Sequence, residues 1–363
     1  MSDDAPESDR VPGAPHPRHA EAAVGHDHAI ADFLAAAGAQ RLHHAWLITG
    51  PRGVGKATLA WAMTRWLLSG GAPGDLRLPP GDPVARRVAA LSEPRLHLVR
   101  RGFDQKTGRL KAEIGVDDIR ALLGFFHMSA AEGGRRVAIV DAADQMNGAA
   151  ANALLKVLEE PPEGGLILLI AHQPARLLPT IRSRCRELRL SPLAPEDMTA
   201  VLAGLGVTED AEALSALSGG SVGEALRLAG QEGLKVYRQI IELFETLPRF
   251  DRMKARALAE AAGARATADG DPFDLRVTLL DLFLTRLARA GLLGAPVPEA
   301  APGEAALMAR LCPDTDAARV WAGAQADLSA RARSGRAVNL DPAALVMDML
   351  TQLAGLGPAH AKA

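Results

Sequence analysis

The sequence contains little cysteine and few aromatic residues. Its 363 residues include two cysteines, Cys185 and Cys312, and 4% of them are aromatic. Two cysteines cannot form a disulfide framework or a four-thiolate zinc site, so we expect reduced thiols and no bound metal. One tyrosine and four tryptophans also give no stacking platform for single-stranded nucleic acid.

The chain also lacks an excess of charge and any long apolar run. Its formal net charge is −2, so no global field attracts nucleic acid, and any contact with DNA must come from a local patch. No apolar run approaches the roughly 18 residues that a membrane span needs. The first residues lack the basic and apolar regions of a signal peptide. We therefore expect a cytoplasmic protein without a membrane partner.

The chain is long enough for two or three domains and rich enough in apolar residues for a substantial core. Hydrophobic residues make up 48% of it, and because aromatics are few, Ala and Leu carry most of the burial and favour helices. Residues 1–20 are instead rich in Pro, Asp and His, which predicts a disordered tail.

Short apolar runs alternate with amphipathic stretches between residues 21 and 192. The runs predict buried parallel strands, and their alternation with helices predicts a doubly wound α/β domain. The expected strands are Ala45–Thr49, Leu96–Val99, Val137–Val140, Leu166–Ala171 and Glu187–Leu190, and the expected helices are Lys56–Leu68, Val116–Ala130, Ala143–Leu158 and Leu177–Arg182.

The strand pattern ends after Pro192. Residues 193–232 predict a small domain of short helices, and residues 233–363 keep helical spacing and predict an all-α bundle. Before the Val116 helix lies a cluster of charges. A solvated loop explains this cluster, and a contact with DNA phosphates or with a neighbouring subunit is the alternative. Its members are Arg100, Arg101, Lys106, Arg109 and Lys111.

A phosphate-binding loop lies between the first predicted strand and the helix that follows it. The segment 50–56 reads Gly-Pro-Arg-Gly-Val-Gly-Lys, in the strand–loop–helix context that the P-loop motif requires. Its backbone N–H groups wrap phosphates, the helix N-terminus favours their charge, and the lysine reaches the β and γ oxygens. The candidate nucleotide-binding residues are Gly50, Gly53, Gly55, Lys56, Ala57 and Thr58.

The residue after the P-loop lysine argues against hydrolysis. The motif places Ser or Thr there to ligate Mg²⁺, but this chain has Ala57. Thr58 does not replace that hydroxyl, because one residue along a helix rotates the side chain by about 100°. We expect phosphate binding to persist and metal-assisted hydrolysis to be lost.

The second acidic motif is incomplete in a similar way. The apolar segment 137–140 ends in Asp141, which has the layout of a Walker B strand, and we include it in the degenerate nucleotide site. Active ring ATPases usually follow this residue with a Glu that orients the attacking water, whereas Ala142 stands here. Asp144 suits a helix cap instead.

The segments 152–162 (NALLKVLEEPP) and 178–185 (LPTIRSRC) carry a specific resemblance. Both are similar to motifs of the bacterial clamp-loader ATPases of the AAA+ class, the gamma/tau and delta-prime subunits of DNA polymerase III. The resemblance spans residues 24–228 with specific motifs. It implies a P-loop AAA+ domain with a five-stranded parallel sheet, a helical lid and an all-α collar for oligomerisation.

The same resemblance assigns a role to Arg184. In the family, the arginine of the Ser-Arg-Cys element projects to a neighbour's ATP, and a guanidinium suits a developing phosphoryl charge. The alternative is that Arg182, Arg184 and Arg186 form a basic strand edge. Two sensor positions of active relatives are altered, to Ala-His-Gln at 171–173 and to Gly223. Lost catalytic features beside a retained finger fit a non-hydrolysing, delta-prime-like stator.

The resemblance also implies partners and limits cofactors. The implied partners are gamma/tau and delta subunits in a hetero-oligomeric ring, the sliding clamp beta and primer–template DNA, within a DNA-directed DNA polymerase (a nucleotidyltransferase complex) at the replisome. No cofactor is required, and ATP or ADP is expected to bind weakly at most, without hydrolysis. Many relatives carry a four-cysteine zinc module near residues 69–94. This chain has no cysteine there, so no zinc is expected.

The sequence leaves two other functions and one set of histidines to explain. An active gamma/tau-like motor would have to tolerate Ala57 and Ala142, and a P-loop nucleotide kinase would leave the Ser-Arg-Cys element at 183–185 unexplained. Histidines 26, 28, 43 and 44 have no carboxylate or thiol at metal-ligand spacing, and we interpret them as solvated or capping. Those at 26 and 28 are also placed where relatives contact the adenine ring.

Overall fold

The computed structural model describes residues 7–11, 14–39, 42–72, 74–127, 134–208, 210–267 and 270–360. The chain divides into two compact units. The first runs to Asp197 and includes Gly220–Gly223, and the second comprises Met198–Gly219 and the rest of the chain from Glu224. The domain boundaries expected from the sequence remain predictions. The two units are groups of residues in mutual contact, and this division does not test where three separate domains would begin and end.

The first unit is built on a five-stranded parallel sheet, which confirms the predicted fold class. The strand order is β2-β5-β6-β1-β7, and a separate two-stranded antiparallel hairpin pairs β3 with β4. The strands are β1 (Ala45–Thr49), β2 (Leu96–Arg100), β3 (Phe103–Asp104), β4 (Arg109–Leu110), β5 (Arg136–Asp141), β6 (Gly165–Ala171) and β7 (Arg186–Arg189).

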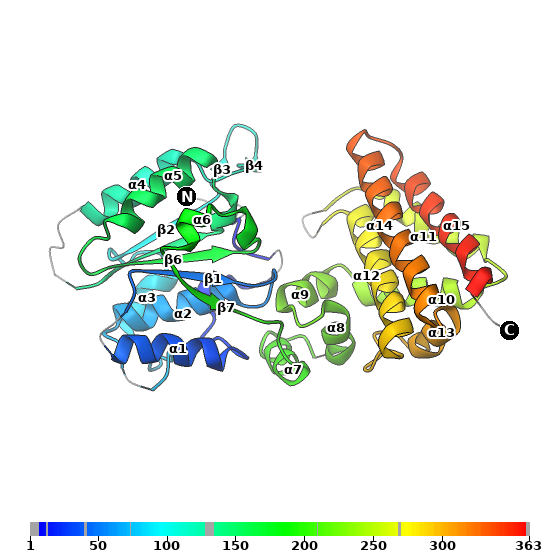
Figure 1. The fold of residues 1–363 in the computed structure, drawn as a ribbon, viewed down its shortest axis with the longest axis horizontal. Helices are drawn as coiled ribbons and strands as arrows, with labels where there is room; N and C mark the ends of the chain where they lie inside the picture. The colour runs from blue at the N-terminus through cyan, green and yellow to red at the C-terminus, as the bar shows by residue number, and fades with distance from the viewer. Residues whose placement is uncertain are drawn as a thin grey trace. The chain divides into compact units, whose positions relative to one another are not determined.

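Both faces of this sheet are buried, which is why its strands read as continuous apolar runs. Alternate residues such as Leu47, Val140 and Leu169 join a core cluster with α4 and α5. Figure 1 shows α4 and α5 on one face of the sheet and α1, α2 and α3 on the other. The helices of this unit are α1 (Asp27–Gly38), α2 (Lys56–Leu68), α3 (Pro83–Ala89), α4 (Val116–His127), α5 (Gly148–Glu159) and α6 (Pro179–Arg182).

Two predicted helices differ from the structure in detail. The expected helix at 116–130 is α4, and its last three expected residues lie outside the described part of the chain. The expected helix at 143–158 is interrupted, because a short 3₁₀ turn, Ala143–Gln145, precedes α5. Asn147 caps α5 by accepting a hydrogen bond from the Ala150 amide at 2.9 Å.

The described part of the N-terminal segment is folded, contrary to the disorder expected from its composition. We call residues 7–11 and 14–20 the N-terminal arm. It contains a 3₁₀ turn, Pro17–His19, that packs beside α2 and α3. Asp9 and His16 have side chains 0% and 1% exposed. Composition alone suggested disorder because it does not reveal that the arm's acidic residues pair with a distant arginine, Arg100.

The described regular structure of the second unit consists of helices and one isolated bridge between Thr267 and Gly270. Its helices, two of which begin in or beside the first unit, are α7 (Pro195–Gly204), α8 (Ala211–Ser218), α9 (Val222–Gly230), α10 (Gly233–Glu245), α11 (Arg252–Glu260), α12 (Pro272–Leu293), α13 (Glu304–Leu311), α14 (Thr315–Ala337) and α15 (Pro342–His360). A buried polar cluster joins three of them. Glu304 is 0% exposed, pairs with Arg286 at 2.7 Å and accepts a hydrogen bond from the Tyr237 hydroxyl at 2.5 Å. Within the described ranges, no helix is long and apolar enough to cross a membrane.

Candidate nucleotide site and arginine finger

The P-loop has the backbone that its glycines predict. β1 ends at Thr49 and α2 begins at Lys56. Gly50, Gly53 and Gly55 have φ values of 142°, 74° and 99°, a region that residues with a Cβ rarely adopt. A Cβ added to Gly50 would lie 2.4 Å from the Leu190 carbonyl oxygen. The loop can therefore keep this path only with glycine at these positions.

Lys56 is turned onto its own loop. The side chain is buried, and its Nζ donates to the Gly50 carbonyl at 2.8 Å and to the Pro51 carbonyl. Burial lowers the pKa of Lys56 to about 8, against the opposing charges of Asp141 and Asp144. To reach a phosphate, the ammonium group must exchange these carbonyls for phosphate oxygens.

Ala57 and Thr58 occupy the first turn of α2, and both are half-buried. The position that normally offers the metal-ligating hydroxyl therefore presents a methyl group. Thr58 is the next residue of the same helix, so its side chain points in a direction rotated by about 100°.

Asp141 ends β5 and lies in register with Arg100 of β2 and Ile170 of β6. It is 6% exposed, and burial, followed by the charge of Asp9, raises its pKa to about 7. A carboxyl group that is about half protonated near neutrality is a weaker metal ligand than a fully ionised one. The fold thus places a carboxyl group at the Walker B position, but this group binds a metal ion poorly.

Asp144 does not cap a helix, which corrects the expectation from the sequence. Its Oδ1 accepts a hydrogen bond from the His172 amide at 3.0 Å, and its Oδ2 accepts one from the Gln173 amide at 3.1 Å. It therefore fixes the loop after β6, where active relatives place a sensor. Burial and the Lys56 charge lower the pKa of His172 to about 4, so this side chain is neutral at physiological pH.

The segment Gly220–Gly223 packs directly on the P-loop. The Ser221 hydroxyl donates to the Arg52 carbonyl at 3.0 Å, and the Gly223 amide donates to the Gly53 carbonyl at 3.1 Å. A Cβ added to Gly223 would lie 2.9 Å from the Cα of Gly53. A side chain at position 223 could not keep this packing.

His26 is buried, so its interpretation as a solvated or capping side chain was wrong. It stands at the N-cap position of α1 without a side-chain capping bond, and its Nε2 donates to the Val54 carbonyl at 2.6 Å. This hydrogen bond holds the His26 ring against the backbone of the P-loop. The expectation holds for His28, whose side chain is 93% exposed. His44 instead bonds the Leu158 carbonyl through Nε2 at 3.1 Å.

Arg184 lies in the connection between α6 and β7 and reaches the surface. Its side chain is 36% exposed and pairs with Glu159 at 3.0 Å. Its Nη1 also donates to the Thr180 carbonyl at 3.0 Å. The loop is short because α6 ends at Arg182 and β7 begins at Arg186. Arg184 is therefore held in place at its base, with the guanidinium partly open to solvent.

Arg184 and the P-loop lie at opposite ends of the sheet. β7 is parallel to β1, and Arg186 pairs with Trp46 near the start of β1. The P-loop follows Thr49 at the other end of that strand. Four residues of strand span about 13 Å, and Arg184 precedes the strand while Lys56 follows it. The structure thus does not bring Arg184 together with the nucleotide-site residues of its own chain.

The basic cluster at 100–111 is divided by the structure. Arg100 is the last residue of β2, and it pairs with Glu7 and Asp9 of the N-terminal arm. This corrects the view of Arg100 as part of a solvated loop. Arg109 begins β4 of the hairpin, and Lys106 lies in its exposed turn. Lys106 and Arg109 are exposed, so the hairpin part of the cluster stays open to a partner.

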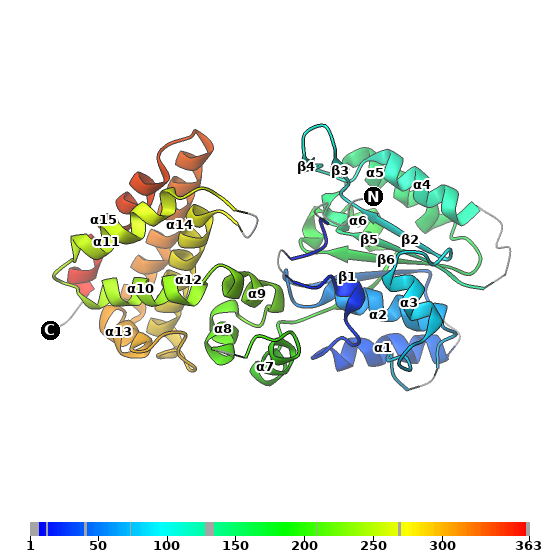
Figure 2. The ribbon, with the colours of Figure 1, turned by 180° about the vertical axis from the view of Figure 1, so that it is seen from behind.

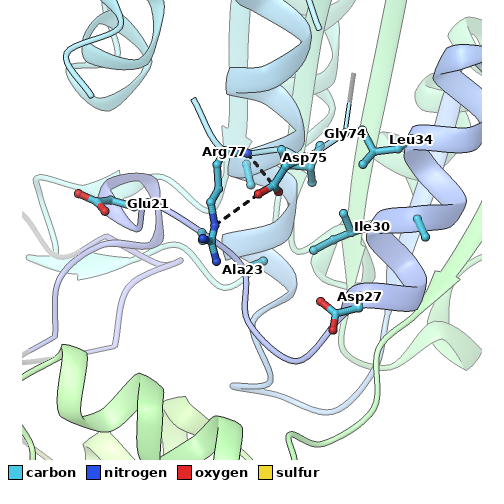
Figure 3. Close-up of a pocket in the computed structure, with 12 residues that line it drawn as sticks. Glu21, Ala23, Asp27, Ile30, Leu34, Gly74, Asp75 and Arg77 are labelled. Carbon is cyan, nitrogen blue, oxygen red and sulfur yellow. Dashed lines mark hydrogen bonds and ion pairs between the residues drawn. The ribbon is translucent and has the colours of Figure 1, made fainter. Parts of the chain in front are cut away.

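A surface pocket of about 310 Å³ lies elsewhere on the first unit. Figure 3 shows Asp27, Ile30 and Leu34 of α1 on one side and Asp75 and Arg77 on the other. None of the P-loop residues 50–58 lines it. Residues 74–77 of the loop-rich segment line part of the pocket, which is separate from the P-loop.

These features define a class of protein: a P-loop α/β domain in which an alanine follows the loop lysine. Residues 25–194 match the family model described as "DNA polymerase III, delta subunit". Over that segment, which is less than half of the chain, the sequence is similar to this family.

The relatives are bacterial DNA polymerase III subunits. The chain is 38% identical over 226 residues to subunit delta' of Pseudomonas aeruginosa, covering 60% of this chain and 65% of that protein. It is 35% identical to subunit delta' of Bacillus subtilis, covering 57% and 60%. It is also 35% identical to subunit gamma/tau of Mycobacterium tuberculosis, covering 50% and 30%. The chain thus spans less than two thirds of these relatives' lengths.

Among solved structures, the similarities are weaker. A DNA polymerase III gamma-subunit-related protein of Thermotoga maritima aligns with a TM-score of 0.37 and 18% identity, covering 87% of this chain and 95% of that one. The Holliday junction branch migration motor RuvB of the same organism aligns with a TM-score of 0.39 and 16% identity, covering 76% and 80%.

Proposed function

We propose that this chain is the delta-prime subunit of a bacterial clamp loader and that it does not hydrolyse ATP itself. In this proposal it supplies Arg184 to the ATP site of an adjacent gamma/tau subunit while the complex places the sliding clamp on primed DNA. The similarity to subunits named delta' and gamma/tau supports the assignment to this complex. The work would take place in the cytoplasm, at the replisome.

One observation carries the finger proposal: Arg184 lies at the amino end of the sheet, whereas the P-loop lies at its carboxyl end. An arginine in that place cannot serve the ATP site of its own chain and is free to serve a neighbour's. Its ion pair with Glu159 joins side chains 36% and 50% exposed. Exposed pairs of this kind contribute little, so exchanging the carboxylate for a phosphate costs about 1 kcal/mol or less.

The chain's own site supports the non-hydrolysing part of the proposal. The metal hydroxyl is missing at Ala57, and the water-orienting Glu is missing at Ala142. Lys56 is held by loop carbonyls, and burial keeps much of Asp141 protonated near neutrality. Each of these alone weakens phosphoryl transfer, which depends on positioning and on metal charge. For this chain to hydrolyse ATP, all four of these features would have to be restored.

The second unit supports a role in assembly. At the end of α12 and in the loop that follows it, Leu292, Leu293 and Val297 are 62%, 76% and 93% exposed. Exposed apolar groups that lie close together favour a protein contact over solvent. In the proposal this helical unit is the collar that packs against the delta and gamma/tau subunits.

The proposal is tested in a clamp loader reconstituted with this chain by measuring DNA-stimulated ATP hydrolysis. Arg184→Ala is expected to lower the total rate substantially, because one site loses its finger, whereas Lys56→Ala leaves it nearly unchanged. Arg182→Ala, which removes an exposed arginine of the same segment, is the matched control and is expected to have no effect. Loss of hydrolysis with Lys56→Ala and none with Arg184→Ala would make this chain a motor.

A further inference from the structure

The N-terminal arm lies across the carboxyl edge of the sheet, where parallel α/β domains bind their ligands. Its acidic residues meet Arg100, which ends β2 beside Asp141 of β5. Glu7 Oε1 is 2.9 Å and Asp9 Oδ1 is 2.5 Å from the Arg100 guanidinium. The negative charge of Asp9 also acts on Asp141. In Figure 2 the arm is the dark blue trace at this end of the sheet.

The arm is anchored by buried charges rather than by loose contacts. The Asp9 side chain is 0% exposed, and its Oδ2 is 3.0 Å from Nε2 of His16. Glu7 joins Arg100 to Arg18 of the arm itself, the latter at 2.7 Å. Buried charges are tolerated when they are paired, and removing one partner leaves the other desolvated. Arg100 is the partner that connects the arm to the sheet.

A second anchor holds the arm to the P-loop helix α2. Arg65 donates from Nη1 to the Arg18 carbonyl at 3.0 Å and from Nη2 to the Ala20 carbonyl at 2.6 Å. The His16 ring stands edge-on to the Trp61 ring, with centroids 5.8 Å apart. Because Trp61 and Arg65 are four residues apart, both contacts fix the arm along one face of the P-loop helix.

Between these anchors the arm reaches the phosphate-binding loop. A Cβ built on Gly223 would lie 2.9 Å from the Cα of Gly53 and 3.4 Å from Cγ2 of Val11. Val11 therefore lies against the pair of glycines where the P-loop meets the segment Gly220–Gly223. The described arm residues, from Glu7 to Val11, connect the Walker B end of β5 to the phosphate loop.

We propose that the N-terminal arm is an internal competitor of nucleotide, which occupies the approach to the P-loop and places the carboxylate of Asp9 where phosphates would enter. The arm excludes phosphate by its bulk and by its charge. Nucleotide binds only to molecules whose arm has left Arg100. The inference goes beyond the role of Arg184 and applies to the isolated chain.

This arrangement makes a quantitative prediction about affinity. If only a fraction of the molecules has an open arm, the measured dissociation constant exceeds the intrinsic one by the inverse of that fraction. Displacing the arm therefore increases affinity without adding any contact to the nucleotide. A neighbouring subunit that captured the arm would have the same effect.

The test is ADP binding to the isolated chain, measured by isothermal titration calorimetry. The full chain is compared with a chain that begins at Glu21 and with Arg100→Ala. Both variants are expected to bind ADP at least tenfold more tightly than the full chain. Adding Lys56→Ala to Arg100→Ala is expected to abolish the gain, because the nucleotide then loses the P-loop lysine. Arg120→Ala, which removes another arginine–carboxylate pair on the surface, is the matched control and leaves the affinity unchanged.

Trypsin cleavage after Arg10 and Arg18 reports directly on release of the arm. Arg100→Ala is expected to be cut there faster than the full chain, and this readout stands even if the shortened chain fails to fold. Equal ADP affinity of the full chain and a folded variant with a released arm would overturn the proposal. So would an arm that Arg100→Ala leaves uncut, or a gain in affinity that survives Lys56→Ala. None of these results depends on whether Arg184 acts as a finger.

Discussion

At the scale of single residues, the nucleotide site is defined by which side chains can bind a metal ion or a phosphate and which cannot. Ala57 offers no metal ligand, and Asp141 offers a carboxyl group whose pKa is raised to about 7 by burial. Gly223 leaves no room for the arginine that active relatives carry in this segment. The glycines of the loop and Lys56 retain the geometry of a phosphate site.

The first prediction concerns the contact between Gly223 and Gly53. Gly223→Ala is expected to destabilise the protein by about 1–3 kcal/mol, because its Cβ would press on the Gly53 backbone. The measurement is the free energy of unfolding by denaturant. Gly124→Ala in α4 is the control, since a Cβ there has nothing within 4 Å. That change is expected to stabilise by about 0.5–1 kcal/mol. Equal effects of the two substitutions would contradict the packing described here.

The second prediction follows from the raised pKa of Asp141, which is about 7 against an ordinary 3.8. Between these values the folded state holds a proton that the unfolded state has released, so stability falls as pH rises from about 4 to 7. Asp141→Asn is expected to remove this loss, on the order of 1.4 kcal/mol for each pKa unit. Unfolding titrations at several pH values measure it. A variant whose stability follows the wild-type pH profile would show that Asp141 is ionised at low pH.

At the scale of elements, the sheet was predictable and several shorter elements were not. The five parallel strands are buried on both faces, so each leaves an uninterrupted apolar run in the sequence. The short helix α3 was missed because it lies in a loop-like stretch, although Asp82 before Pro83 is a helix-start signal. The hairpin strands β3 and β4 are two residues each, too short to show alternation.

The site was predictable where it depends on local sequence and not where it depends on distant partners. The P-loop and the strand before Asp141 follow from short motifs. The arm was expected to be disordered because Asp9 and Arg100 are 91 residues apart, a pairing that no local pattern reveals. The burial of His26 also required the fold, since its partner Val54 is 28 residues away.

The third prediction concerns the start of α5. Asn147→Ala is expected to destabilise the protein by about 1 kcal/mol, because the Ala150 amide loses its capping acceptor. Asn147→Asp keeps an acceptor and is expected to be nearly neutral. Denaturant unfolding of both variants provides the measurement, and a neutral Asn147→Ala would show that the cap contributes nothing.

The fourth prediction concerns the polar cluster that links α10, α12 and α13. Glu304→Ala leaves the Arg286 guanidinium without its carboxylate and Tyr237 without its acceptor, both in a buried place. The expected loss of stability is about 3–5 kcal/mol. Glu304→Gln keeps an acceptor of similar size and is expected to lose less. Calorimetric unfolding that showed the same loss for both would contradict this and attribute the whole effect to the lost carboxylate charge rather than to the acceptor or to packing.

At the scale of the whole molecule, the chain combines a phosphate loop that is closed on itself with an arginine that faces away from it. Lys56 is held by loop carbonyls, whereas Arg184 is held at its base and partly exposed. In the proposed function, a subunit with this division of roles contributes to hydrolysis in an assembly and performs none alone. The proposed activity therefore depends on the boundary between this chain and a neighbour.

The measurement that tests this claim most directly is hydrolysis by a single neighbouring site. In a reconstituted clamp loader, the P-loop lysine is substituted in every gamma/tau subunit except the one whose site adjoins this chain, and single-turnover ATP hydrolysis is followed with primed DNA present. Arg184→Ala is predicted to lower the rate by about 10³-fold or more, as arginine fingers do in other phosphoryl-transfer systems, while ATP binding and the Lys56→Ala rate stay unchanged. Hydrolysis that continues at the wild-type rate in Arg184→Ala would contradict the account.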